Sequence, residues 1–302
     1  MKLSRLLKTS FLLICLLGIW YFFIKDYNYK ITFKTKQIPG IVYNHILNWN
    51  DGESKGNPVV TNFENIPFKE VNQELKSGDT ILNLNWEIKK EDDEITFITL
   101  KITDPEHSFN QNIQALFGKN GFIKKRISKV KELNIKIDEQ SKLYNLSLIE
   151  KAQTPSTFCA CLPIESKVSD KAKAMVGNIT ILSDYINDNN IKLAGNPFSE
   201  ITNWDMENDK IKFNFCFPLA DKKNYPEHNK IQFKKIEQRD ALKAIFNGNY
   251  NMSHLAWYII LDYANTNNIS IETSPMEVYL NDPHMGGNAL NWSAEVYMPI
   301  KN

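Results

Sequence analysis

The 302-residue chain carries 36 basic and 35 acidic side chains, a formal net charge of +1 at pH 7. This length suffices for two domains and an additional segment. The nearly balanced charge argues against an electrostatic nucleic-acid binder, and we predict no nucleic-acid partner.

The first 25 residues contain an apolar run, Thr9–Ile24, that follows the basic residues Lys2, Arg5 and Lys8. The run is short for a membrane span of about 20 residues, but leucines before it and aromatic residues at its end lengthen it. A cleaved signal peptide is the alternative, yet no small-x-small cleavage site follows. We predict an uncleaved single-pass anchor, residues 1–25. Basic residues flank the stretch on both sides, so the positive-inside rule gives almost no indication of its orientation. The default for such anchors places the body outside the cytoplasm.

Residues 26–141 are predicted to form an α+β unit. A strand at Lys30–Lys36 and a short helix at Gly40–Trp49 precede a hairpin, Leu82–Ile102, whose apolar residues alternate. A long helix follows, with apolar residues at helical spacing: Ile123, Ile127, Val130, Leu133 and Ile137. This order of elements resembles a START-like (polyketide cyclase, SRPBCC) domain, and the stretch from Val42 to Trp49 is similar to the first helix of that fold.

Residues 142–302 contain an internal repeat. The segment Ser183-Asp-Tyr-Ile-Asn-Asp-Asn-Asn-Ile191 aligns with Leu261-Asp-Tyr-Ala-Asn-Thr-Asn-Asn-Ile269 and is identical at Asp, Tyr, the three Asn and Ile. Such a repeat predicts two similar units, residues 142–220 and 229–302, each ordered strand, strand, helix, strand, strand and packed with pseudo-twofold symmetry. A chance resemblance of two Asn-rich segments is the alternative. The fold class is therefore α+β throughout.

A hairpin at the end of the second repeat supplies the candidate binding surface. Two runs with strand periodicity flank a turn rich in Gly and Asn, Asp282–Asn288. In the first strand Glu277 and Tyr279 are expected on one face, and Met276, Val278 and Leu280 on the other. In the return strand Glu295 and Tyr297 are expected on one face, and Trp292, Ala294, Val296 and Met298 on the other. We predict one apolar face and one face of carboxylates and tyrosines.

Four short motifs in residues 248–299 resemble the second half of the GyrI-like family, an effector-binding domain also found at the C-terminus of AraC-type and multidrug-sensing regulators. They are Gly248-Asn-Tyr250, Leu255-Ala-Trp257 on a helix, Pro275-Met-Glu-Val-Tyr279 and Ala294-Glu-Val-Tyr-Met-Pro299. The resemblance covers about residues 142–302 and implies two units around a cleft that binds amphipathic or cationic organic compounds. It also implies that Glu277 is the key acid and that Tyr250, Trp257 and Tyr279 form an aromatic wall.

The surroundings of Glu277 decide what such a cleft would bind. No basic residue lies among its near sequence neighbours, which leaves open a cation from elsewhere in the chain. An ionised carboxylate in an apolar cleft is costly unless paired. A ligand cation can supply the missing charge, and cation–π attraction adds about 0.5–2 kcal/mol. Alternatively, burial raises the pKa of the acid and makes it a general acid or base.

Each candidate residue also has a purely structural interpretation. Glu277 can be solvated or bonded to a backbone amide, Trp257 can be plain core, and Glu295 can be a strand-surface acid. Trp204 and Trp292 can also wall the cleft, although Trp292 continues the apolar face of the hairpin and is expected in the core.

The remaining chemistry-bearing residues indicate no metal and no cofactor. Cys159 and Cys161 are too close in sequence to suggest a bridge with each other, whereas Cys216 can pair with either; buried free thiols are the favoured state. The chain has no paired Cys-x-x-Cys motif, its five histidines show no metal-ligand spacing, and no P-loop, Rossmann glycine motif or nucleophile elbow is present.

The leading hypothesis is a membrane-anchored protein that binds a small amphipathic or cationic ligand without turning it over. A hydrolase of reactive small molecules, with Glu277 as acid or base, is the first alternative. A module that binds and inhibits a protein partner through an outer surface is the second. No helix-turn-helix precedes the repeats, so regulation of DNA by this chain is not expected.

Overall fold

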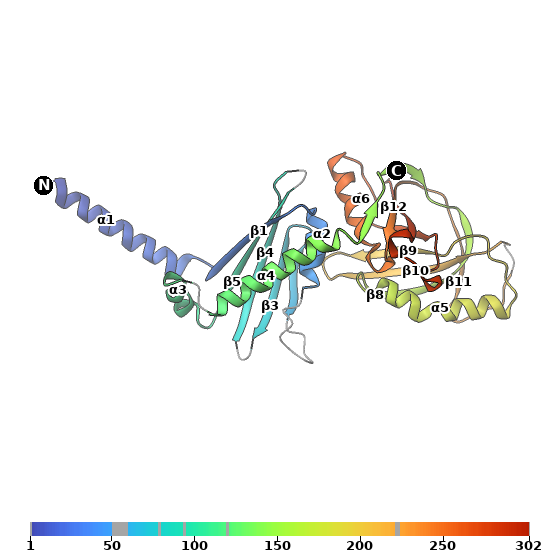
Figure 1. The fold of residues 1–302 in the computed structure, drawn as a ribbon, viewed down its shortest axis with the longest axis horizontal. Helices are drawn as coiled ribbons and strands as arrows, with labels where there is room; N and C mark the ends of the chain where they lie inside the picture. The colour runs from blue at the N-terminus through green and yellow to red at the C-terminus, as the bar shows by residue number, and fades with distance from the viewer. Residues whose placement is uncertain are drawn as a thin grey trace. The chain divides into compact units, whose positions relative to one another are not determined.

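The computed structural model describes residues 2–49, 60–77, 80–92, 95–118, 121–220 and 224–301. The chain divides into two compact units, residues 1–137 and 138–302, and Figure 1 labels many of their elements. This division falls just before the predicted boundary at residue 141, near the end of the long helix.

The first unit contains an N-terminal helix, a five-stranded antiparallel sheet and further helices. In chain order its elements are α1 (Lys2–Ile19), the π-helical turn η1 (Trp20–Ile24), β1 (Tyr29–Thr35), α2 (Pro39–Leu47), β2 (Val60–Ile66), β3 (Glu70–Ser77), β4 (Thr80–Lys90), β5 (Thr96–Thr103), α3 (Ser108–Leu116) and α4 (Gly121–Gln140). The strand order is β1-β5-β4-β3-β2. The sequence did not predict β2, β3 or α3; β2 is an edge strand with mostly exposed residues, so it lacks the apolar alternation that marks a strand.

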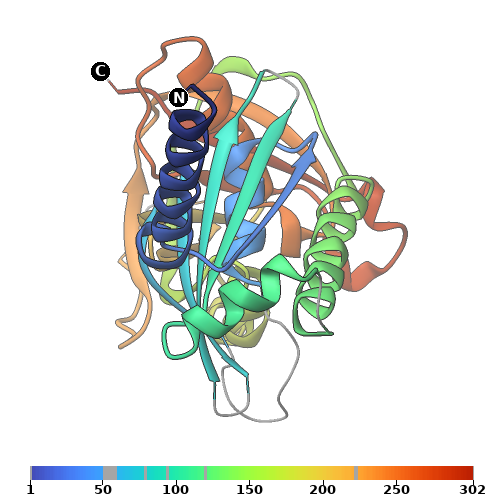
Figure 2. The same ribbon diagram turned by 90° about the vertical axis from the view of Figure 1, so that its left-hand side faces the viewer.

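One face of this sheet is buried beneath α2 and α4 (Figure 2). On β4, Leu82, Leu84, Trp86 and Ile88 are buried while their neighbours are exposed or half-buried, as the two-residue period of a strand requires. The predicted stripe of α4 packs against them. The observed order of strand, helix, sheet and long helix agrees with the expected elements, and the START-like resemblance stays a prediction.

The N-terminal helix carries one stretch, Leu6–Ile24, that is long and apolar enough to cross a membrane; its 19 residues have a mean hydropathy of 2.0 and none is buried. At 1.5 Å per residue the stretch measures roughly 28 Å, close to the ~30 Å of a bilayer's hydrocarbon core. A signal sequence meets the same criteria of length and composition.

The second unit is built on a nine-stranded antiparallel sheet. Its elements are β6 (Tyr144–Leu146), β7 (Glu150–Gln153), β8 (Thr157–Lys167), α5 (Lys171–Asp188), β9 (Phe198–Asp205), β10 (Lys210–Pro218), β11 (Gln232–Ile236), β12 (Asp240–Gly248), η2 (Tyr250–Met252), α6 (Leu255–Thr266), β13 (Met276–Tyr279), η3 (Pro283–Met285), η4 (Ala289–Asn291) and β14 (Ser293–Pro299). The central strand order is β8-β10-β9-β13-β14-β12. Two equivalent units placed side by side would give this order; the duplication and its symmetry stay a prediction.

The aligned segments of the two predicted repeats end helices in the same way. Asn190 and Asn268 adopt left-handed backbone conformations, with φ of 50° and 55°, directly after the C-caps of α5 and α6. The amide of the next residue then donates back into the helix, Ile191 N to Ile186 O and Ile269 N to Ala264 O. Asn tolerates this conformation better than most residues, so the shared Asn-Asn-Ile has a local structural cause.

The register of β13 on β14 corrects the predicted faces of the hairpin. Glu277 pairs with Val296, and Tyr279 pairs with Ala294. Directly paired residues of antiparallel strands point to the same face. The prediction of one apolar and one acidic face is therefore wrong: each face of the hairpin carries one glutamate and one tyrosine. The connection extends beyond the predicted turn at Asp282–Asn288 and contains two 3-10 turns, η3 and η4.

Candidate functional site

A pocket of about 520 Å³ lies in the second unit, at the face of the sheet that carries Glu277. Side chains of α5 and β10, the turn η2 and the loop between β13 and β14 enclose it. Its walls are mainly apolar or aromatic, namely Ala172, Met175, Val176, Ile179, Pro197, Phe215, Phe217, Tyr250, Tyr279, Leu280, Pro283 and Trp292. Its polar residues are Asn196, Asn249, Asn251, Asn281 and Asp282. The volume is typical of a small-molecule site.

A buried polar cluster lies next to this pocket, beyond the ring of Tyr279. Lys171 and Glu277 are 1% and 0% exposed, and Lys171 Nζ donates a hydrogen bond to Glu277 Oε2. The Tyr279 hydroxyl donates to the same oxygen over 2.8 Å. Ser253 Oγ lies 2.8 Å from it and accepts from Lys171 over 3.0 Å. Tyr279 is also a wall of the pocket, so its ring separates a ligand from the ion pair.

Burial dominates the electrostatics of this cluster. It lowers the pKa of Lys171, while the charge of Glu277 and the hydrogen bond to it act in the opposite direction. It also raises the pKa of Tyr279 well above its ordinary value, with the negative charge of Glu277 adding to the rise. Tyr279 is therefore a neutral hydrogen-bond donor, and Lys171 and Glu277 together carry no net charge when both are ionised.

The structure brings together four of the five predicted site residues. Tyr250 and Tyr279 line the pocket, with ring centroids 5.0 Å apart. Glu277 lies behind them, fully buried. Trp257 is core, as its structural interpretation expects, and its ring lies 4.9 Å from Lys171 Nζ. Trp204 packs edge-on against Trp257 and is not a wall of the pocket.

Two expectations about the site are wrong. Glu277, on β13, is not a lone acid among aromatic rings, because Lys171 supplies the cation from helix α5. Trp292 is not in the core: it is half-buried and lines the pocket. The cause is the loop before β14, where Trp292 Nε1 donates to the carbonyl of Gly286 over 3.2 Å.

The sequence reasoning missed Lys171, and one signal could have found it. The buried residues Met175, Leu182 and Ile186 define the inner face of α5. Lys171 precedes Met175 by four residues and therefore falls on the same face. A lysine in register with an apolar stripe indicates a buried cation that needs an acid.

The opposite face of the sheet carries a second set of the same residue types. Lys243 Nζ lies 2.7 Å from Glu295 Oε1, and the Tyr297 hydroxyl donates to Glu295 Oε2 over 2.8 Å. The side chains of Lys243 and Glu295 are 17% and 24% exposed. Glu295 therefore does not belong to the pocket, in agreement with its interpretation as a strand-surface acid.

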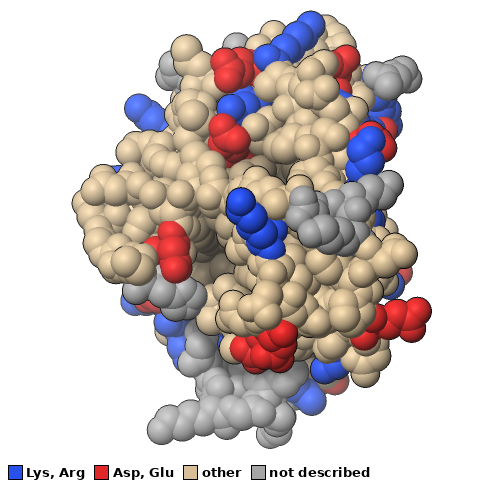
Figure 3. Space-filling model, turned by 90° about the vertical axis from the view of Figure 1, so that its right-hand side faces the viewer, with Lys and Arg blue, Asp and Glu red and all other residues tan. Residues whose placement is uncertain are grey.

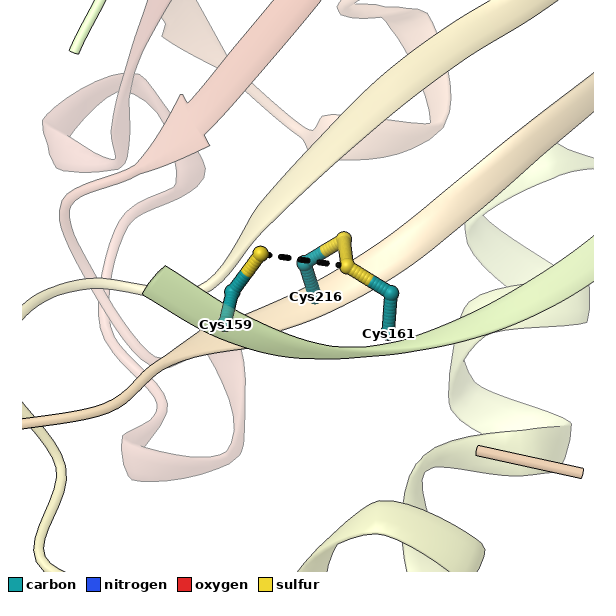
Figure 4. A group of neighbouring side chains, drawn as sticks. All are labelled: Cys159, Cys161 and Cys216. Atoms are coloured by element: carbon teal, nitrogen blue, oxygen red, sulfur yellow. Dashed lines mark hydrogen bonds between the residues drawn. A yellow bond between two sulfur atoms is a disulfide. The ribbon is translucent and has the colours of Figure 1, made fainter. Parts of the chain in front are cut away.

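Three cysteines gather on this opposite face (Figure 4). Cys161 and Cys216 face each other across β8 and β10 and form a disulfide, so the favoured prediction of free thiols is wrong for this pair. Cys159 remains a buried thiol whose sulfur lies 3.3 Å from that of Cys161. The three sulfurs lie within 4.8 Å of one another, but the disulfide occupies two of them.

Charged side chains of both signs lie scattered among uncharged ones on the face drawn in Figure 3. On this face they form no continuous basic surface of the kind that a phosphate backbone requires.

Residues 164–301 match the GyrI-like family, described as a GyrI-like small molecule binding domain. The match begins within β8, later than the predicted start at residue 142. It assigns most of the second unit to a class of small-molecule-binding domains. No curated protein matches the chain.

Solved structures with a similar arrangement include the EcmrR C-terminal domain (16% identity, 53% of this chain and 99% of that chain, TM-score 0.44). An EcmrR–DNA complex is similar at 15% identity over 65% of this chain and 72% of that chain, with a TM-score of 0.46. SAV2435 bound to tetraphenylphosphonium is similar at 10% identity over 52% and 95%, with a TM-score of 0.38. At these scores the likeness assigns no ligand and no partner to this chain.

Proposed function

We propose that this protein captures a small, uncharged, amphipathic organic molecule in the pocket of its second unit and that its N-terminal helix holds it in a membrane. The observation that carries the proposal is an apolar pocket whose neighbouring buried acid, Glu277, already has its cation in Lys171.

The pocket favours a ligand with a flat apolar body and one or two polar groups. Aromatic rings such as those of Phe217, Tyr250 and Trp292 offer large contact areas with few rotatable bonds. The asparagines of the wall can both donate and accept hydrogen bonds. They can therefore orient an amide, hydroxyl or carbonyl of the ligand, beside the carboxylate of Asp282 in the same wall.

The buried ion pair bears on the charge of the ligand. A cationic ligand would have to compete with Lys171 for Glu277. Lys171 has the advantage, because it is part of the same chain and is already hydrogen-bonded to Glu277. Because the charge of Lys171 cancels that of Glu277, the pair offers a second cation no net attraction. We therefore propose an uncharged ligand rather than a cationic one.

Equilibrium binding of an uncharged biaryl probe to the full chain in lipid nanodiscs tests the proposal. We expect one saturable site. Ile179→Trp, which fills the pocket from α5, should weaken binding at least ten-fold. Ile181→Trp on the same helix is the matched control, because Ile181 lines a different hollow. Equal binding to both variants, or capture of one stoichiometric protein partner with no probe binding, would contradict the proposal.

We propose binding without turnover. Glu277 and Lys171 are fully buried behind Tyr279, so neither reaches a ligand in the pocket without movement of that ring. Hydrolysis by Glu277 remains the rival function. Incubation of the wild-type chain with a reactive electrophile, followed by mass spectrometry, distinguishes the two: product formation that disappears in Glu277→Gln would favour the hydrolase.

The membrane part of the proposal is supported by contacts of the apolar helix with the folded unit. The Tyr21 hydroxyl donates to the backbone carbonyl of Asn112, and the ring of Phe22 packs on that of Phe109. Cleavage after the helix would remove these contacts. The Cys161–Cys216 disulfide supports a body outside the cytoplasm, because disulfides persist in oxidising compartments.

A further inference from the structure

The short helix α3 is fastened to the end of the apolar helix. Tyr21 and Asn112 exchange hydrogen bonds: the Tyr21 hydroxyl lies 3.1 Å from Asn112 O, and Asn112 Nδ2 lies 3.5 Å from Tyr21 O. The rings of Phe22 and Phe109 have centroids 5.3 Å apart. Because η1 holds both Tyr21 and Phe22, α3 lies beside the last turn of the apolar stretch.

A buried polar network fixes α3 to the body of the first unit as well. Asn112 is 1% exposed, and its Oδ1 accepts from Asn28 Nδ2 over 2.9 Å. Asn28 Nδ2 also donates to the carbonyl and hydroxyl oxygens of Ser108. Tyr29 at the start of β1 donates to the side chain of Gln111 over 2.9 Å. The helix α3 is therefore fixed to the body of the first unit through side chains at three of its positions, Ser108, Gln111 and Asn112.

The side of α3 that faces away from the polar network of Asn112 and Asn28 is apolar. Phe109, Ile113, Leu116 and Phe117 follow one another at the spacing of one helix face. Phe109, Leu116 and Phe117 are 53%, 59% and 88% exposed, and no residue of Ser108–Leu116 is charged. Large apolar side chains exposed together mark an interaction site.

The contact of α3 with the apolar helix indicates which partner covers this stripe. If Leu6–Ile24 spans a bilayer, its last turn, Trp20–Ile24, lies at the lipid–water boundary, where aromatic residues gather. A helix bound to that turn lies at the same depth. We propose that α3 is an interfacial helix whose stripe Phe109, Leu116 and Phe117 enters the headgroup–acyl boundary of the same membrane, and so holds the first unit against the bilayer surface. This inference rests on the anchoring proposed above.

An amphipathic helix without charge binds lipid through buried apolar area rather than through anionic headgroups. The contact should therefore form on zwitterionic lipid. Single nitroxide labels on the full chain in phosphatidylcholine nanodiscs measure the depth of each site from its relative accessibility to oxygen and to a water-soluble nickel chelate. Phe117 and Leu116 are suitable sites, because exposed side chains can be replaced without disturbing the core.

The labels also separate the inference from the anchor. Native Cys15, exposed within the apolar stretch, reports the span. Phe117→Cys and Leu116→Cys in a Cys15→Ser chain report α3, and Glu74→Cys, at an exposed position of β3, reports the aqueous side. We expect Cys15 deep in the bilayer, the α3 labels near phosphate depth and the Glu74→Cys label in water. A deep Cys15 with α3 labels as water-accessible as the Glu74→Cys label would overturn the inference alone, and a water-accessible Cys15 would overturn both.

Discussion

Each face of the hairpin β13–β14 carries one glutamate and one tyrosine that a lysine from another element joins, with opposite outcomes. On one face Lys171, Glu277 and Tyr279 are buried beside the apolar pocket. On the other face Lys243 and Glu295 remain partly open to water, while Tyr297, which donates to Glu295, is buried. In both sets the lysine comes from a different element than the glutamate, and the tyrosine stands two residues after it.

The difference teaches that solvent, rather than residue type, decides what a Lys–Glu–Tyr group contributes. An ion pair in water is screened and contributes little. A fully buried pair has lost the hydration of both charges, so each partner depends on the other. The buried set can therefore control the charge of the pocket, whereas the open set serves the surface of the sheet.

The largest expected effect comes from breaking the buried pair. Lys171→Met leaves Glu277 ionisable and unpaired in the core and should lower the free energy of unfolding by about 3–5 kcal/mol. Lys243→Met is the matched variant on the open face and should lower it by about 0.2–1 kcal/mol. Chemical denaturation measures both. Equal losses would show that the two faces do not differ as described.

Removing both buried charges should be milder than removing one. In Lys171→Met/Glu277→Gln no ion is left in the core, so the double variant should recover most of the stability that Lys171→Met loses. A double-mutant cycle measures the coupling between the two positions. If the losses of the two single variants simply add, the residues do not act as a pair.

A smaller, pH-dependent effect should mark the open face. Burial acts to raise the pKa of Glu295, but hydrogen bonds from Lys243 and Tyr297 outweigh it, so the pKa lies below its ordinary 4.5. A lowered folded-state pKa stabilises the fold above the unfolded value, and this stabilisation is lost as pH falls through the folded value. The difference in Tm between wild type and Glu295→Gln should therefore shrink as the pH falls below 4.5. Glu165→Gln, at an exposed position, controls for the loss of one charge.

The smallest effect concerns the core beneath the open face. Burial raises the pKa of the Cys159 thiol to about 12, so almost no thiolate exists at pH 8. In a Cys15→Ser chain, a thiol reagent should find no reactive group in the folded protein and one per chain after unfolding without reductant. Three thiols after unfolding would mean that the Cys161–Cys216 disulfide is absent.

Local patterns predicted most of the elements, because apolar period and helix-end signals are local. The alternation on β4 and the stripe of α4 located those elements correctly. The strand β2 was not predicted because little of it is buried. The strand β3 was not predicted because a polar residue, Gln73, stands between its buried apolar residues Val71 and Leu75. The resemblance in residues 248–299 pointed to a class of domain that the match of residues 164–301 supports.

The site was harder to predict, because its two decisive features are non-local. Lys171 and Glu277 are 106 residues apart in sequence, and the residues near Glu277 give no indication that Lys171 is its partner. The register of β13 on β14 depends on the loop between them, whose 3-10 turns have no simple signature. An offset in that register moved Glu295 and Tyr297 to the face opposite Glu277, as a one-residue slip does in any half-buried sheet.

One measurement tests most directly whether Lys171 makes the pocket a site for uncharged ligands. A biaryl probe that ends in a tert-butyl group and its trimethylammonium isostere have nearly the same shape and differ by one positive charge. We predict that wild type binds the tert-butyl probe at least ten-fold more tightly and that Lys171→Met shifts the ratio toward the cation. Tighter binding of the trimethylammonium probe by wild type would contradict the account.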